Sequence, residues 1–372
     1  MMENIVIDNK IKTKLEILEI NSSHFKKTKE NKPANGNNKT FLAPLPDTKD
    51  KRYGNLPQDN AVPNEISLPH NKNNIKIKVY EYTPAPGWSY FRNMLFRECH
   101  RKYWFHYYGL RYGDAQISRE VKKLRNLTSL PLEIGNAVHK TIAQSLKNAI
   151  TRNEYPSKEK LIIDGSETFE RQLENKHFFE KDLANGLDEK RLSNALGRME
   201  EAFATFECHP LLPEIISSLT ERPELCVIDP AGYGEYRIEK KKAYAKPDLV
   251  YQNREGQTKI IDWKTGKQNG AETLIQLGGY LFYTVDVLNR PVDKLEGRMI
   301  YLSQSQDDLI LKPSKGRIEM IKNRILREIG EIEEYCIDPD NNVPKPREYF
   351  SKTTDPHRCS FCKFKHICHE YT

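Results

Sequence analysis

Apolar side chains recur every three or four positions in several stretches of the chain, as they do on the buried face of a helix. This spacing predicts helices at residues 91–108, 132–150, 272–288 and 318–335, and an all-helical segment from 157 to about 209. Shorter apolar runs with β-branched or aromatic residues predict strands at 245–251, 259–263, 298–302 and 309–312. The mixture predicts an α/β domain with a mixed central sheet flanked by helices, with 318–335 covering one sheet face.

Residues 1–77 lack this regular pattern. Lys, Asn, Asp and Pro dominate there, and apolar residues are too sparse to offset the entropy cost of ordering the chain. We expect a disordered or loosely ordered, solvated tail, with a partner-docking arm as the alternative. Alternation at 75–80 predicts a short strand at its end. One domain then covers residues 78–372, and the helices at about 157–209 form an insertion beside the sheet.

Two of the predicted strands, 245–251 and 259–263, are separated by turn-forming residues at 253–256, so we expect a β-hairpin. Side chains alternate along a strand, so Asp262 and Lys264 share one face. Ile261 and Trp263, which follow the opposite phase, point to the other face.

Carboxylates gather at this hairpin. Asp248 lies on its first strand and Asp262 on its second, and carboxylate oxygens are the ligands that hard divalent ions such as Mg²⁺ prefer. Lys264 beside them can orient a water or stabilise developing phosphate charge, which together favours metal-assisted phosphodiester hydrolysis. A surface hairpin with scattered charges is the alternative. Glu221, just upstream, is a further candidate carboxylate, or else a surface residue.

Composition changes this picture little. The chain has 372 residues, enough for one large or two modest domains, and a formal net charge of +7, which fits a polyanionic partner without requiring one. No apolar run approaches the roughly 18 residues of a membrane span, and the start lacks the features of a secretory signal. We therefore expect a cytoplasmic protein that does not contact a membrane.

Three cysteines lie within ten residues, in the pattern Cys359-x2-Cys362-x5-Cys368. Clustered thiols in a chain without an export signal favour a metal centre over disulfides. A zinc site or a four-cysteine iron–sulfur cluster needs a fourth ligand.

The predicted helix at 91–108 combines aromatic and basic residues, with Cys99 in its middle. Such a mixture suits single-stranded nucleic acid, through phosphate pairing and base stacking. Packing of most of these aromatic residues in the core is the more ordinary interpretation.

At this point the chain resembles a known family. Pro247-Asp248 followed by Asp262-Trp263-Lys264 is similar to the PD-(D/E)XK nuclease signature, and the next residues, Thr265-Gly266, match its RecB-like branch. The resemblance extends from about residue 88 to the C-terminus. It implies a restriction-endonuclease-like fold and metal-dependent hydrolysis of DNA.

Two further motifs occur in the order of that branch. Gly135-x-x-x-His139 resembles its Gly-x-x-x-His motif, whose histidine approaches the metal, and Gln276-x-x-x-Tyr280 resembles its Gln-x-x-x-Tyr motif, which lines the cleft near the nucleic acid. Without the resemblance, the better interpretations are a surface or core histidine with its hydrogen bonds satisfied, and a tyrosine that packs beside the leucines of its helix. Positions four apart share one face of a helix.

The resemblance implies roles for these residues. Asp248, Asp262 and His139 bind Mg²⁺ or Mn²⁺ with the backbone carbonyl of Trp263, and Lys264 positions the attacking water. Gln276 and Tyr280 orient the substrate.

Members of the RecB-like branch with one cysteine ahead of the Gly-x-x-x-His helix and three at the C-terminus hold a [4Fe–4S] cluster. They include CRISPR adaptation nucleases, the AddB subunit and related single-strand exonucleases. Cys99, Cys359, Cys362 and Cys368 match that layout, which implies an iron–sulfur staple between the two ends of the domain. Zinc is the alternative, with a nearby histidine replacing one thiolate. The remaining cysteines, Cys208, Cys226 and Cys336, are expected to be ordinary buried residues.

By resemblance, the expected activity is exonucleolytic cleavage of single-stranded DNA in repair, recombination or defence. One alternative is a nucleic-acid-binding or assembly subunit with a weak or idle site, and another is a double-strand-cutting endonuclease. The sequence lacks a Gly-x-x-x-x-Gly-Lys-Ser/Thr phosphate loop, so a helicase motor, if one takes part, is expected to be a separate partner.

Overall fold

The computed structural model describes residues 64–67, 76–182, 189–230, 232, 234–268, 270–303 and 306–370. The chain divides into two units, 1–60 and 61–372, and the described residues all belong to the second. Most of the predicted tail lies outside the described residues. Within its last part, strand β1 (Asn64–Ser67) pairs antiparallel with β2 (Lys76–Val79). In the described residues, no helix combines the length and apolar character that crossing a membrane requires.

A five-stranded sheet forms the centre of the second unit, in the order β11–β10–β9–β8–β5. Strands β9 and β10 run parallel, and the other neighbours are antiparallel. The mixed sheet predicted from the sequence is thereby confirmed. Its strands are β5 (Val227–Ile228), β8 (Leu249–Gln252), β9 (Thr258–Lys264), β10 (Leu295–Tyr301) and β11 (Leu309–Leu311).

Strands β8 and β9 form the expected hairpin, closed by the pair Gln252 and Thr258. In its turn, the N–H of Asn253 donates to the carbonyl of Gln257 at 2.9 Å, and the side-chain oxygen of Asn253 accepts from the N–H of Gln257 at 2.9 Å. Gly256 adopts φ +78°, a backbone conformation that glycine enters without steric cost. The turn residues therefore fix the register of the hairpin.

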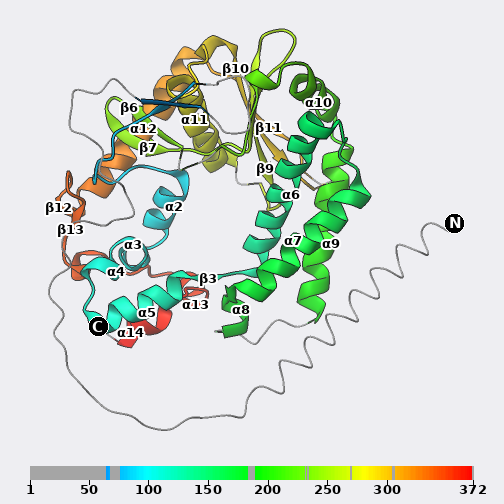
Figure 1. The fold of residues 1–372 in the computed structure, drawn as a ribbon. Coiled ribbons are helices and arrows are strands. Elements are labelled where there is room, and N and C mark those ends of the chain that lie inside the picture. The colour runs from blue at the N-terminus through cyan, green and yellow to red at the C-terminus, as the bar shows by residue number, and fades with distance from the viewer. Residues whose placement is uncertain are drawn as a thin grey trace. The chain divides into compact units, whose positions relative to one another are not determined.

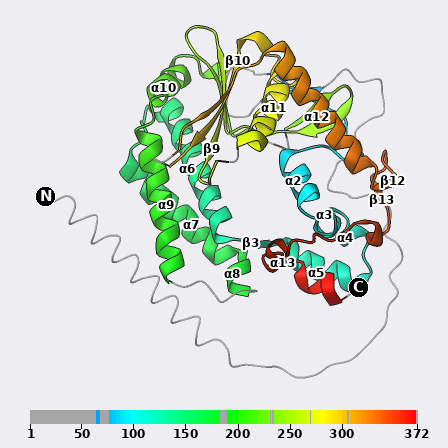
Figure 2. The ribbon, with the colours of Figure 1, turned by 180° about the vertical axis from the view of Figure 1, so that it is seen from behind.

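Helices cover both faces of this sheet (Figures 1 and 2). Residues of β8, β9 and β10 alternate between two apolar cores, as the pleat of a strand requires. On one face lie α6 (Leu130–Arg152), α7 (Lys158–Asn175), α9 (Glu189–Glu207) and α10 (Leu212–Glu221). On the other lie α11 (Gly270–Asp286) and α12 (Lys315–Glu333).

The alternation of side chains along β9 determines which face of the sheet each candidate site residue points to. Ile261 and Trp263 belong to the core under α6 and α9, where the indole of Trp263 packs edge-on against Phe206 at 5.2 Å between ring centroids. Ile260, two residues before Asp262, belongs to the core under α11. Asp262 therefore faces α11, on the side of the strand opposite Ile261 and Trp263, and this alternation is what the sequence predicted.

The predicted helix at 91–108 is wrong in one respect, because it is two helices. Helix α2 (Tyr90–Glu98) ends at Cys99, which is extended with φ −167° and ψ 116°, and α3 (His100–Tyr107) begins after it. The sulfur of Cys99 accepts from the N–H of Lys102 at 3.4 Å and so caps α3. A helical cysteine would point along the helix surface, whereas the break turns this thiol outward.

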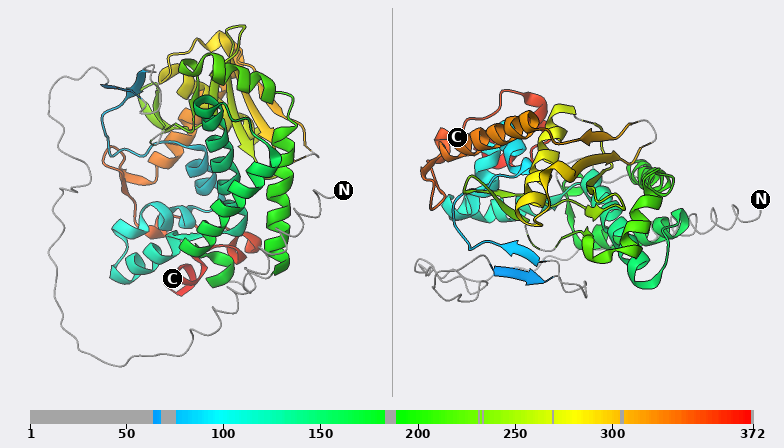
Figure 3. Two further views of the ribbon diagram at one scale, coloured as in Figure 1. Left: turned by 45° about the vertical axis from the view of Figure 1, so that its right-hand side comes forward. Right: turned by 90° about the horizontal axis from the view of Figure 1, so that it is seen from above.

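A third apolar core joins these helices to the C-terminal segment, and Figure 3 shows the C-terminal helices (red) beside α3 to α5 (cyan). The rings of Phe105 and Phe364 stack at 5.6 Å between centroids. The guanidinium of Arg101 donates to the carbonyl of Phe350 at 2.9 Å. Most aromatic residues of α3 are buried here, which confirms the packing interpretation for them.

The remaining elements are short connections and caps. They are β3 (Leu127–Thr128), β4 (His177–Phe178), β6 (Glu235–Ile238), β7 (Lys241–Tyr244), β12 (Cys336–Asp338), β13 (Val343–Pro344), α4 (Gly109–Tyr112), α5 (Ala115–Arg125), α8 (Phe179–Asp182), α13 (Pro356–Ser360) and α14 (Lys365–Glu370). Among the described residues, 3₁₀ turns occur at Pro223–Leu225, Val292–Lys294 and Arg347–Tyr349.

Helix α12 covers one face of the sheet, as predicted, and packs against α11 through a glycine. A Cβ at Gly278 would overlap the buried side chain of Ile321. We therefore expect Gly278→Ala to lower the free energy of unfolding by about 1–3 kcal/mol. Gly330→Ala, on α12 and with open space around it, should raise it by about 0.5–1 kcal/mol through helix propensity. Urea unfolding followed by circular dichroism tests both, and equal stability of the two variants would contradict this packing.

Candidate active site and a cysteine-lined cavity

Backbone pairing brings the two aspartates of the hairpin together at its open end. The N–H of Asp248 donates to the carbonyl of Ile261 at 3.1 Å, across from Asp262. The carboxylate of Asp248 in turn accepts from the N–H of Trp263 at 2.8 Å. Asp248 is thus held by both its own backbone and its side chain, which fixes its position beside the second strand.

Asp262 is buried, with 3 % of its surface exposed. Its Oδ1 accepts from the hydroxyl of Tyr280 at 2.5 Å, and its Oδ2 lies 2.6 Å from the ammonium of Lys264. The two side chains therefore form a close ion pair. Burial raises the pKa of Asp262, against the pull of Lys264, and the charge of Asp248 raises it further. A buried acid repelled by a second acid is an environment that a cation relieves.

Lys264 remains charged in this environment. Burial alone lowers the pKa of its ammonium, but the carboxylates of Asp262 and Asp248 raise it above the ordinary value. The side chain lines the cavity next to these acids. A fixed cation at this place can stabilise negative charge on a phosphate.

His139 reaches the same acids from α6. Its Nδ1 lies 2.9 Å from Oδ1 of Asp248. Burial lowers the pKa of the imidazole, but Asp248 outweighs this effect and raises it. One turn earlier, a Cβ at Gly135 would stand 3.3 Å from the hydroxyl of Thr265, so the glycine lets α6 approach the loop after Lys264 closely.

Gln276 and Tyr280 face each other on α11, as their spacing predicted. The amide of Gln276 donates to the hydroxyl of Tyr280 at 2.8 Å. Because Tyr280 is only 6 % exposed and its own hydroxyl donates to Asp262, it orients that carboxylate. Burial and the two aspartates raise the pKa of Tyr280 well above its usual value, so the hydroxyl stays a donor.

A cavity of about 480 Å³ is lined by His139, Asp248 and Lys264. Asp262, Gln276 and Tyr280 lie behind this lining and do not contact the cavity, so the structure does not place Gln276 and Tyr280 where the sequence predicted a substrate contact. Several polar residues on its wall were not singled out in the sequence: Asn136, Lys140, Asp229 and Lys246. Asp229 follows β5, its N–H donates to the carbonyl of Asp248 at 2.8 Å, and its carboxylate lies 2.7 Å from Lys246. The sequence signal that could have identified Asp229 is its position directly after a short apolar strand.

Glu221 does not belong to this site, so the sequence hypothesis for it is wrong. It ends α10, and its carboxylate pairs with Arg254 in the turn of the hairpin. The turn and Asp262 lie at opposite ends of β9. The exposed pair Glu221–Arg254 is a surface contact.

The acidic groups suit a hard divalent cation of the magnesium type in their donor chemistry. Mg²⁺ typically binds one or two carboxylates and keeps several waters, which matches Asp248 and Asp262. Within the described ranges, no three His, Cys, Asp or Glu side chains converge closely enough to hold one metal ion. The carboxylates of Asp248 and Asp262 are the donors that suit such an ion.

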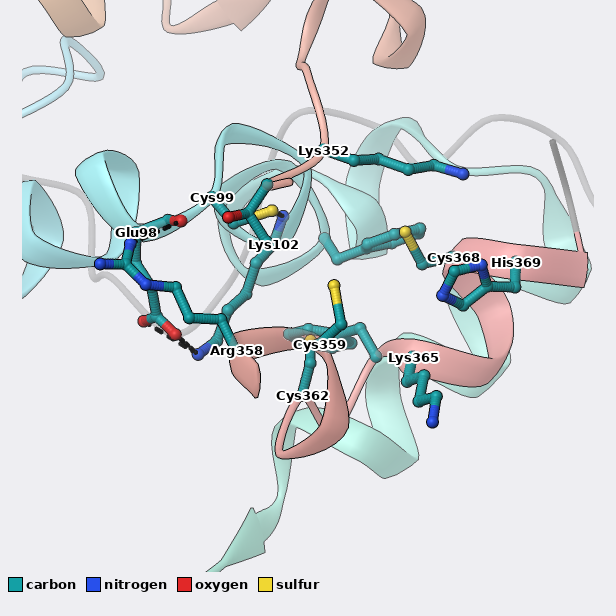
Figure 4. A pocket seen from close by; sticks show the side chains of 13 residues that line it. Glu98, Cys99, Lys102, Lys352, Arg358, Cys359, Cys362, Lys365, Cys368 and His369 are labelled. Carbon is teal, nitrogen blue, oxygen red and sulfur yellow. Dashed lines mark hydrogen bonds and ion pairs between the residues drawn. The ribbon is translucent and has the colours of Figure 1, made fainter. Parts of the chain in front are cut away.

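The four cysteines singled out in the sequence line one cavity of about 80 Å³, which Figure 4 shows from close by. Cys99, turned outward between α2 and α3, lies on one side, and Cys359, Cys362 and Cys368 on the other. One water molecule needs roughly 10–15 Å³ of such space, so the cavity has room for a multi-atom group. Burial raises the pKa of Cys362 to about 11 and also raises that of Cys368.

Basic side chains surround these thiols: Lys102, Lys352, Arg358 and Lys365 line the same cavity. Four thiolates bound to a single zinc ion would stand about 3.8 Å apart, given the roughly 2.3 Å Zn–S bond. The four thiols thus line one cavity with basic side chains on its wall, but within the described residues they do not converge closely enough to hold one metal ion.

Of the other cysteines, Cys226 and Cys336 are buried, as expected. The expectation is wrong for Cys208, which is exposed where α9 ends.

The fold and the site define a class of protein: a mixed α/β domain with a carboxylate–lysine centre of the kind that nucleases carry. The sequence profile of the PD-(D/E)XK nuclease superfamily matches residues 87–369, and the chain belongs to this superfamily. No curated protein matches the chain. A solved structure titled "Crystal structure of SSO0001" matches with 14 % identity over 49 % of this chain and 82 % of its own, at a TM-score of 0.23, which is too low to bear on the fold.

Proposed function

We propose that the chain is a Mg²⁺- or Mn²⁺-dependent deoxyribonuclease of the RecB-like branch. The observation that carries this proposal is the convergence of Asp248, Asp262 and Lys264 at the open end of one hairpin, with His139 opposite. Asp248, Lys264 and His139 line one cavity, and the buried Asp262 contacts Lys264 from behind it, an arrangement suited to metal-assisted hydrolysis.

The reaction is hydrolysis of a phosphodiester, in which water adds to phosphorus and one ester oxygen leaves. Asp248 and Asp262 would hold the divalent cation together with His139 and the carbonyl of Trp263. When bound, such a cation polarises the phosphate and lowers the pKa of a coordinated water.

The chain's own residues complete this site. Lys264 orients the attacking water and stabilises the charge that develops on the phosphate oxygens. Tyr280, held by Gln276, keeps the carboxylate of Asp262 oriented. Trp263 donates its N–H to Asp248 and so sets the spacing of the two acids.

The proposed substrate is the end of a single DNA strand, cleaved exonucleolytically during repair, recombination or defence. Support comes from the resemblance of the Gly-x-x-x-His, Asp-x-Lys-Thr-Gly and Gln-x-x-x-Tyr motifs to the RecB-like branch. A separate helicase or defence complex is the proposed partner.

We further propose a [4Fe–4S] cluster held by Cys99, Cys359, Cys362 and Cys368. The cysteine-lined cavity and its basic wall support it. Such a cluster would join two segments about 260 residues apart, and cross-links that close long loops restrict the unfolded chain most in theory.

A panel of substrates tests the activity. With Mg²⁺ or Mn²⁺ present, we expect linear single strands to be shortened from an end, circular single strands to persist, and duplexes to be cut slowly. Cleavage of circles or internal cuts in duplex would favour an endonuclease. Binding without cleavage of any substrate would favour a subunit with an idle site. Gel analysis of end-labelled strands separates these outcomes.

A further inference from the structure

A second and larger hollow adjoins the catalytic cavity. It has a volume of about 710 Å³ and lies between α2–α3, the start of α6, α8–α9 and the C-terminal segment. Pro131 and Leu132, at the first turn of α6, line both this groove and the catalytic cavity. A chain-like ligand can therefore pass from one to the other without leaving the protein surface.

Apolar side chains are exposed along this groove to an unusual degree. Phe91 is 52 % exposed, Met94 43 %, Leu132 57 % and Phe361 66 %, and all four line the groove. They come from three separate parts of the chain. Exposed apolar surface gathered in a hollow is typical of a binding site.

Positive charge accompanies the apolar side chains. Arg191 and Arg198 are seven residues apart on α9, hence on one face of it, and Lys102 and Lys363 line the opposite wall. The two acids of the groove already have partners, because Glu98 accepts from Lys102 and Glu180 from the N–H of Leu130. The lining therefore carries four basic groups against two acidic ones.

Burial and neighbouring positive charges both act on the basic wall of the groove. Burial lowers the pKa of Lys363 to about 8, with Lys102 and Arg125 contributing. Burial also lowers the pKa of His106 to about 4, and the charges of Arg125 and Lys363 contribute. An anion in the groove would relieve this repulsion.

We propose that this groove binds the part of a single nucleic-acid strand adjoining the phosphodiester in the catalytic cavity, with phosphates at the basic side chains and bases stacked on Phe91 and Phe361. Exposed rings select a single strand, since the bases of a duplex are already stacked on each other. The inference rests on the proposed function, which places the scissile bond in the neighbouring cavity.

Binding of a fluorescein-labelled single strand of about 12 nucleotides, measured by anisotropy in a Lys264→Ala background that prevents cleavage, tests the groove. We expect Phe91→Ala/Phe361→Ala to weaken binding by about tenfold or more, because stacking on aromatic side chains contributes on this scale. The matched control, Tyr155→Ala/Tyr349→Ala, removes two equally exposed rings elsewhere and should bind unchanged.

Two charge-reversal variants on α9 provide a second test of the groove. Arg198→Glu should weaken binding several-fold, with a reduced dependence on salt, whereas Lys190→Glu, exposed on α9 but outside the groove, should have little effect. Groove variants with Lys264 intact should hydrolyse the small diester bis(4-nitrophenyl) phosphate at the parent rate, since this probe needs only the catalytic cavity.

The two proposals fail in different ways. If the parent cleaves DNA but the groove variants bind like their controls, the groove assignment is overturned and the nuclease stands. If no diester is cleaved and the phenylalanine variants still lose binding, the groove stands and the nuclease proposal falls. A parent that binds no single strand, and takes a peptide there instead, overturns the groove assignment.

Discussion

Lys264→Ala should reduce strand cleavage by about 10²–10³-fold, the usual cost of removing one preorganised charge from a transition state. Its ammonium lies 2.6 Å from Asp262 and lines the catalytic cavity. The variant therefore loses charge stabilisation at the scissile phosphate and keeps the contacts of the groove with the rest of the DNA strand. Single-strand affinity should change little. Initial rates on an end-labelled strand, together with anisotropy titration, measure the two quantities separately.

The control for this variant is Lys267→Ala, which removes an exposed lysine three residues further along, in the loop after β9. It should cleave at the parent rate. Full activity of Lys264→Ala in a folded protein would remove the lysine from the mechanism, and with it the basis for placing the reaction at this hairpin.

Cys99→Ser should remove the proposed cluster and destabilise the whole domain. The purified parent is expected to be brown and to absorb near about 400 nm, as cysteine-ligated clusters do. The variant should lose this absorbance and its iron. A cross-link that closes so long a loop is worth about 5 kcal/mol on the loop-closure scale, which corresponds to a melting temperature lower by roughly 10 °C.

Cys208→Ser provides the comparison, because Cys208 is an exposed thiol outside the cysteine-lined cavity. Iron content, colour and melting temperature should match the parent. Elemental analysis decides the metal: a colourless parent with stoichiometric zinc would contradict the cluster and favour the zinc alternative.

The hairpin and its alternating side chains could be predicted because both follow from local rules. Turn residues at 253–256 fix the connection, and a period of two places Asp262 and Lys264 on one face whatever else the fold does. The pair Gln276 and Tyr280 followed in the same way from helical spacing.

Other features depend on long-range packing and could not be predicted. The break at Cys99 interrupts a stretch with good helical character, and it arises where the N–H of Arg101 and its guanidinium both reach a C-terminal segment about 250 residues away. The structure places Asp229 in the catalytic cavity and Glu221 outside it. The reason is that the pairing of β5 with β8 determines which acid lies next to Asp248. Local sequence carries no signal for that pairing.

The third apolar core has a consequence for how the protein folds. Arg101 and Phe350, which meet there, are 249 positions apart, and contacts at such separation form late because the intervening loop must first close. Until they meet, the aromatic rings of α3 stay uncovered. Recombinant production should therefore benefit from slow expression at low temperature, which limits aggregation of the half-assembled chain.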